Sequence, residues 1–339
     1  MIVKGIHYGP WRPGSGPNKG YPYPSAEAID ADLRLIEQLH ANTILVFEPS
    51  NDVLDLAARH GLYVFYSFAL DWWRLGGPEQ SSLREAVLAR VDASRSKPAL
   101  LGWVLGNEVP SLVLDTRGEA PITGGLADLY RAVKQHDPLH PITHSNWPST
   151  KELRLDFLDI TSFNVYPLWP PEVVAKGFGK YLVDVLEARA GDKPLLITEF
   201  GANTLEAGSD GQSRLVEDAW RGLRRAHTIG GIVFEFADEW WKNYDNPKRA
   251  GDWWDRAPAP DDEFRHDQDP EEYYGLMTAE REPRAAFHTV QAMFASDLQP
   301  TSRTIPSIIV MALIVSAAGT WTWAARRRRQ FSDGPSRQR

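Results

Sequence analysis

Short apolar runs alternate with longer amphipathic stretches over most of the chain. Eight such runs precede residue 300, and they begin at Ile2, Asn42, Leu62, Leu100, Pro141, Asp159, Pro194 and Gly230. Between the first two, Ser25 to His40 places Ile29, Leu33 and Ile36 at the three-and-four spacing of one buried helical face, with Ser25 as a suitable cap. This alternation is typical of βα units and a parallel sheet.

Eight βα units in fewer than 300 residues favour a closed barrel over an open sheet. We predict an α/β fold, a (β/α)8 TIM barrel over residues 1–297, with a closing helix at Pro283 to Phe294. In such a barrel the active site lies at the carboxyl ends of the strands. The residues that end each apolar run are therefore the first candidates for chemistry.

The C-terminal part has a different pattern. Residues 305–325 carry no charged side chain, Trp321 and Trp323 lie near one end of this stretch, and Arg326 to Arg329 follow it. About 20 apolar residues cross a hydrocarbon core, and basic residues mark the cytoplasmic flank. We predict a linker at 298–304, one transmembrane helix at 305–325 and a basic cytoplasmic tail at 326–339, although a buried helix with a basic tail is the alternative.

This orientation makes the lipid bilayer a partner and predicts a single-pass membrane protein with an extracytoplasmic barrel. The chain opens on "MIVKGIHYGP", which has neither the basic start nor the long apolar region of a signal peptide. We therefore expect a further segment upstream of the first strand, or insertion by another route.

Composition removes several kinds of function. The formal net charge is −8, which argues against a nucleic-acid partner. The chain has no cysteine, so disulfides, thiolate zinc sites and a cysteine nucleophile are excluded. No metal-binding motif occurs among the scattered histidines, and we expect no cofactor. Thirteen tryptophans are a high count, and large aromatic side chains can stack on sugar rings.

Two strand ends carry glutamates. The run "LLGWVLGNEVP" from Leu100 ends in Asn107 and Glu108, and the run from Pro194 ends in Glu199. Strands four and seven face each other across a barrel mouth, so these carboxylates can share one cavity. Two such groups about 5 to 5.5 Å apart are what a retaining glycosidase requires. The alternative is that each is a solvated loop glutamate.

Three segments carry a resemblance to known enzymes. "GNEV" at Gly106 to Val109 and "TEFGAN" at Thr198 to Asn203 resemble the acid/base and nucleophile motifs of clan A glycoside hydrolases. The segment that begins "NTILVF" at Asn42 resembles family 72 β-1,3-glucanosyltransferases, and the motifs are also similar to the barrel domain of family 2 glycosidases. The likeness covers about residues 2 to 295.

The resemblance implies roles for four residues. Glu108 would be the general acid/base, Glu199 the nucleophile, and Asn107 would bind the sugar 2-hydroxyl. Tyr166, in "NVYP", matches the tyrosine that orients the nucleophile, although a strand-end tyrosine alone is more often part of the core.

Further candidates follow the other strands. His144 could bind substrate or be structural, and the aromatic candidates for a sugar platform are Tyr8, Trp72, Trp147 and Trp240, with Trp11, Trp73, Trp169 and Trp241 nearby. Glu235 and Glu239, after the eighth run, are carboxylates that could support the site.

One position departs from the family pattern. Relatives carry an arginine in "NTIRV" that helps to hold the nucleophile ionised, whereas this chain has Leu45. Our leading hypothesis is a membrane-anchored retaining glycoside hydrolase or transglycosylase that acts on a β-linked oligo- or polysaccharide. The alternative is a catalytically impaired pseudoenzyme that binds glycan at the membrane.

Overall fold

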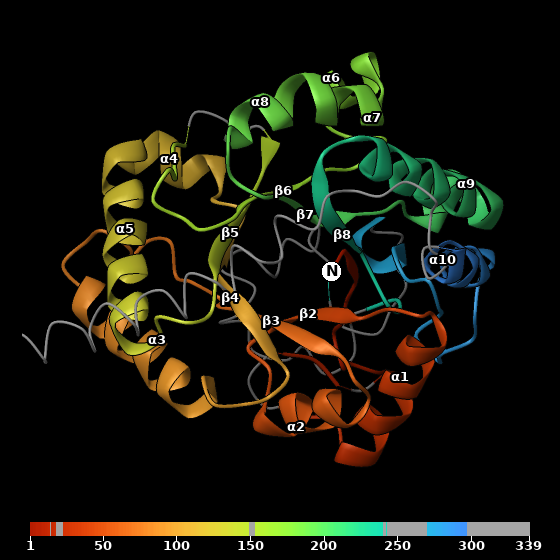
Figure 1. Ribbon diagram of the computed structural model, residues 1–339, viewed down its shortest axis with the longest axis horizontal. Coiled ribbons are helices and arrows are strands. Elements are labelled where there is room, and N and C mark those ends of the chain that lie inside the picture. Colours follow the sequence, from red (N-terminus) through yellow and green to blue (C-terminus); the bar gives the residue numbers. More distant parts are fainter. Residues whose placement is uncertain (14, 18–22, 149–152, 240–241, 243–269, 297–339) are drawn as a thin grey trace, which may run out of the picture. The chain divides into compact units, whose positions relative to one another are not determined.

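The strands form a closed barrel in chain order. The computed structural model describes residues 1–13, 15–17, 23–148, 153–239, 242 and 270–296. Eight parallel strands pair in the order β1 to β8, and β8 pairs again with β1 (Figure 1). Their bounds are β1 Val3–His7, β2 Thr43–Phe47, β3 Tyr63–Ser67, β4 Leu100–Asn107, β5 Ile142–Asn146, β6 Thr161–Asn164, β7 Leu195–Phe200 and β8 Thr228–Val233. Each of the first seven predicted runs contains one of these strands, and the eighth overlaps β8, which begins two residues before it, so the predicted TIM barrel is confirmed.

Helices surround the strands (Figure 1). They are α1 Ala26–Gln38, α2 Asn51–Arg59, α3 Gln80–Ser94, α4 Ser111–Arg117, α5 Glu119–His136, α6 Pro171–Lys176, α7 Phe178–Tyr181, η2 Leu182–Leu186, α8 Glu187–Ala190, α9 Thr204–Arg225, η6 Pro270–Tyr273 and α10 Ala285–Ser296. Ser25 caps α1 by accepting a hydrogen bond from the Ala28 amide, as its sequence position predicts. The closing helix also forms, two residues later than predicted at each end.

Apolar side chains fill the barrel below its mouth. One buried cluster takes a single residue from each of six strands, which places it on the barrel axis; its members are Val3, Leu45, Phe65, Val104, Ile160, Leu196 and Ile232. A larger cluster packs the outer faces of the strands against the helices. Because the interior is solid, a ligand can enter only at the ends of the strands.

The segment that follows β8 differs from its prediction. The eighth apolar run extends past Val233, but the strand ends there, so Glu235 and Glu239 lie in the segment that follows β8.

The predicted linker, transmembrane helix and basic tail lie outside the described residues. No helix in the described part of the chain combines the length and apolar character that a membrane crossing requires.

Candidate active site

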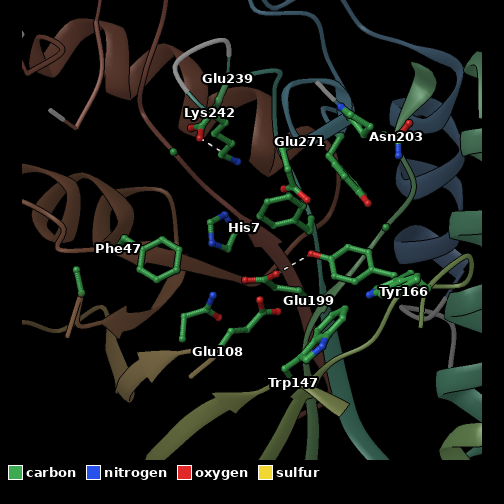
Figure 2. A pocket seen from close by; sticks show the side chains of 18 of the residues that line it. His7, Phe47, Glu108, Trp147, Tyr166, Glu199, Asn203, Glu239, Lys242 and Glu271 are labelled. Carbon is green, nitrogen blue, oxygen red and sulfur yellow. Dashed lines mark hydrogen bonds and ion pairs between the residues drawn. The ribbon is translucent and has the colours of Figure 1, made fainter. Parts of the chain in front are cut away.

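A cavity of about 850 Å³ opens at the carboxyl ends of the strands. Its lining includes His7 at the end of β1, Phe47 at the end of β2, Glu108 just after β4 and Glu199 near the end of β7. Figure 2 shows these side chains pointing toward one another. The predicted pair of glutamates therefore faces one pocket.

The end of β4 is shaped to present Glu108. The pairing of β4 with β5 shifts register between Val104 and Asn107, and Gly106 and Glu108 both have positive φ, at 79° and 44°. A Cβ at Gly106 would lie 2.5 Å from the Trp72 ring, so glycine permits both the turn and the close packing. The apolar strand thus ends in a turn that exposes its last polar residues to the cavity.

One amide holds the polar end of β4. The Nδ2 group of Asn164, at the end of β6, donates to Asn107 Oδ1 at 2.9 Å and to Glu108 Oε1 at 2.8 Å. The Thr198 hydroxyl in turn donates to Asn164 Oδ1 at 2.8 Å. Asn164 therefore fixes Glu108 relative to β7, which carries Glu199.

Glu199 is held from the other side. The Tyr166 hydroxyl donates to Glu199 Oε2 at 2.6 Å, a short charge-assisted hydrogen bond. This is the contact that the resemblance implied for Tyr166, and Figure 2 shows the pair beside Trp147.

Burial sets the electrostatics of the two glutamates. Burial raises the pKa of Glu108 to about 7; the hydrogen bond from Asn164 opposes this shift and the charge of Glu271 adds to it. Burial and then the repulsion of Glu108 raise the pKa of Glu199, while the Tyr166 hydrogen bond and Lys242 act in the opposite direction. Because the two groups titrate together, the pair retains a proton close to neutral pH.

The chain matches the model of a known protein family. The model of the TIM-barrel domain of glycosyl hydrolases family 2 matches residues 23–296. The chain belongs to this family. The predicted likeness to clan A and to family 2 is thereby confirmed, while a comparison with curated proteins found no match.

Solved structures share the fold of this family 2 barrel. A β-galacturonidase from Eisenbergiella tayi aligns at a TM-score of 0.66 with 20% identity, covering 87% of this chain and 51% of its own. A β-glucuronidase from Ruminococcus gnavus aligns at 0.66 with 16% identity, covering 87% and 50%. One from Bifidobacterium dentium aligns at 0.65 with 20% identity, covering 82% and 44%. This chain spans about half the length of these proteins.

Several predicted binding residues border the pocket of the family 2 barrel. Asn107, Trp72 and Trp147 line it. Tyr8 also lines it, but its hydroxyl donates to Asp32 at 3.3 Å and its ring is fully buried, so it offers the cavity only part of its ring. Trp240 lies outside the described residues.

His144 lies elsewhere. Its Nδ1 donates to the Leu105 carbonyl at 2.8 Å, and its ring borders a separate cavity near α8, not the pocket of the glutamates. Burial lowers the pKa of His144 to about 4, so the ring is neutral. Its placement supports the structural alternative that the sequence left open.

Other residues that line the pocket of the family 2 barrel, or that hold its glutamates, escaped sequence analysis. His7 and Asn164 are the last residues of β1 and β6, where strand alternation could have identified them as facing the mouth. Lys242 and Glu271 follow β8 in irregular or short helical segments, where no period exists to reveal them.

Position 45 carries leucine where the family pattern has arginine, and Lys242 is a cation that acts on Glu199 from elsewhere. Leu45 is buried among the apolar side chains inside the barrel. Lys242 instead reaches the pocket from the segment after β8 and lowers the pKa of Glu199. This effect of Lys242 on Glu199 is smaller than those of burial, Glu108, Tyr166 and Glu271. No cluster of metal-ligating side chains occurs among the residues that the structure describes.

Proposed function

We propose that the chain is a retaining glycoside hydrolase or transglycosylase that acts on a β-linked glycan. The observation that carries the proposal is that Glu108 and Glu199 face one cavity, with Asn164 bound to the first and Tyr166 to the second. Two carboxylates with different partners in one site are suited to a double displacement. Membership of family 2 supports the same activity.

Each glutamate has one role in the proposed mechanism. Glu199 attacks the anomeric carbon while Glu108 gives its proton to the leaving oxygen, which forms a covalent glycosyl-enzyme. Glu108 then removes a proton from water or from a sugar hydroxyl, which attacks the anomeric carbon and releases Glu199. Asn107 binds the 2-hydroxyl, and the hydrogen bond from Tyr166 keeps one oxygen of Glu199 oriented.

Aromatic side chains support a carbohydrate as the substrate. Trp11, Trp72, Trp147 and Trp169 all line the cavity. The apolar faces of sugar rings stack on such side chains, and the similar structures are a β-galacturonidase and β-glucuronidases. An oligo- or polysaccharide is therefore the proposed substrate.

The position of Lys242 weakens the pseudoenzyme alternative. Leu45 motivates that alternative, because loss of the arginine would leave the nucleophile without electrostatic support. Lys242, although paired with Glu235 and Glu239, still lowers the pKa of Glu199 from another element. The catalytic proposal therefore does not require an arginine at position 45.

We also propose that the chain is anchored in a membrane through residues 305–325. Their lack of charge and the four arginines that follow support this anchoring, with the barrel on the extracytoplasmic side.

Glutamate-to-glutamine variants test the catalytic proposal. Glu199→Gln should lose turnover of every aryl β-glycoside that the native protein cleaves. Glu108→Gln should keep activity on a substrate with a good leaving group and should be accelerated by azide, giving a β-glycosyl azide. Native-like turnover in both variants would contradict the proposal.

A further inference from the structure

One corner of the pocket holds polar groups that the proposed mechanism does not use. We call it the β1–β8 corner, and it consists of His7, Glu239 and Lys242, which all line the cavity. Figure 2 shows the three side chains on the same side of the pocket, with Phe47 and the two glutamates of the mechanism beyond His7.

Glu239 in this corner is buried and only partly paired. Its side chain is 3% exposed; Oε2 lies 3.1 Å from Lys242 Nζ, while Oε1 has no hydrogen-bond partner among the described residues. A Cβ at Gly9 would lie 1.6 Å from Oε1, so the glycine leaves room for this oxygen. A buried carboxylate oxygen in a cavity wall is costly unless a donor reaches it.

His7 has the same property. Its ring is buried, and neither nitrogen has a partner within the described part of the chain. Burial, and then the charge of Lys242, hold the pKa of His7 well below its usual range, so the ring is neutral. It therefore offers one donor and one acceptor to a ligand.

The positive charge of Lys242 is already balanced. Its ammonium group pairs with Glu235 and with Glu239, both buried, and burial raises the pKa of Glu235 well above its usual range. The charge of Lys242 is therefore already matched by carboxyl groups of the protein. A ligand carboxylate placed here would lie beside the Glu239 carboxylate without a positive charge left to pair with it. A hydroxyl group would instead donate a hydrogen bond to Glu239.

We propose that the β1–β8 corner binds the hydroxyl groups of an uncharged sugar ring and excludes a uronate. Glu239 Oε1 accepts from one hydroxyl, and His7 exchanges donor and acceptor contacts with another. This inference rests on the proposed function, and it separates the chain from the β-glucuronidases and the β-galacturonidase that share its fold.

Paired substrates test the inference on the full chain. We expect nitrophenyl β-glucoside, β-galactoside or β-mannoside to be cleaved with kcat/KM more than about tenfold above β-glucuronide and β-galacturonide, because a buried like charge costs at least that much. A uronide cleaved as well as the best neutral glycoside would overturn the inference and leave the proposed function intact.

Variants show which residues set the preference. Glu239→Gln removes a charged acceptor and the like charge beside a uronate, so kcat/KM for the neutral glycoside should fall about 10- to 100-fold while the uronide loses less. His7→Gln should raise KM for the neutral glycoside. Equal losses on both substrate types in Glu239→Gln would indicate a merely structural role and would overturn the assignment. Glu217→Gln, on the exposed side of α9, is the matched control.

A binding measurement keeps the two proposals separate. Methyl β-glycosides and methyl β-glucuronide are titrated calorimetrically into the native chain. Binding of the neutral glycosides alone supports the inference even if nothing is cleaved, an outcome that would overturn only the catalytic proposal. Preferred binding of the glucuronide, or no binding of any sugar, overturns the inference.

Discussion

Glu108 is a carboxyl group that burial keeps protonated close to neutral pH, and this predicts the shape of the pH profile. As general acid it must hold its proton, so kcat/KM should fall as pH rises through about 7, the pKa of Glu108. Glu199 must be ionised, so activity should also fall toward acid pH. A bell-shaped profile on an aryl β-glycoside is the expected result.

Tyr166→Phe checks the acid side of this profile. The hydroxyl of Tyr166 stabilises ionised Glu199, so its removal should raise the pKa of Glu199 and move the acid limb toward neutral pH. The alkaline limb should stay where it is, because Tyr166 makes no hydrogen bond to Glu108. A shift of the alkaline limb alone would show that Tyr166 acts on the other glutamate.

Leu45→Arg tests whether the chain needs the arginine of its relatives. Leu45 is 1% exposed among apolar side chains, so a buried guanidinium there should cost several kcal/mol of unfolding free energy. We expect a lower Tm and no gain in kcat/KM, because Lys242 already supports Glu199. The control, Leu45→Met, should cost less than about 1.5 kcal/mol. A stable and more active Leu45→Arg variant would show that the charge from Lys242 is insufficient.

At the scale of elements, closure of the barrel depends on a glycine in β8. Gly230 has φ 124° and pairs with Val3 of β1, and a Cβ there would lie 2.1 Å from the Val3 carbonyl oxygen. Gly230→Ala should therefore destabilise the fold in two ways, through a clash with the backbone and through an unfavourable φ. Denaturant unfolding should show a loss of unfolding free energy well above that of the control variant. Gly61→Ala is that control, with φ 67° and open space around it, at about 1 to 2 kcal/mol. Equal losses in the two variants would mean that moving β1 away from β8 at this position has no effect on stability.

The apolar runs explain which elements could be predicted from the sequence. Each apolar run marks a strand because buried parallel strands need apolar side chains on both faces. The positions of Glu108 and Glu199 followed from those runs. Lys242, Glu271 and the hydrogen bonds of Asn164 could not be predicted, because they depend on register shifts and irregular segments that carry no period. The pocket was therefore predictable at its strands, whereas Lys242 of the β1–β8 corner was not.

At the scale of the whole molecule, residues 2–296 form one compact unit. The two glutamates and their described partners all lie within it. The catalytic chemistry should therefore need no residue beyond α10. The proposed membrane attachment, in contrast, would rest on residues 305–325.

The last prediction separates these two properties. The full chain, expressed in a bacterial host, should sediment with membranes and resist alkaline extraction, since about 20 uncharged residues span a hydrocarbon core. A chain that ends at Ser296 should lose this attachment and keep the same kcat/KM on an aryl β-glycoside. A second variant with two lysines in place of Val310 and Leu313 should also lose attachment while retaining every other residue, because each central lysine costs about 2.5 to 3.5 kcal/mol on insertion. If the lysine variant stayed in the membrane fraction, an element other than residues 305–325 would hold the chain there.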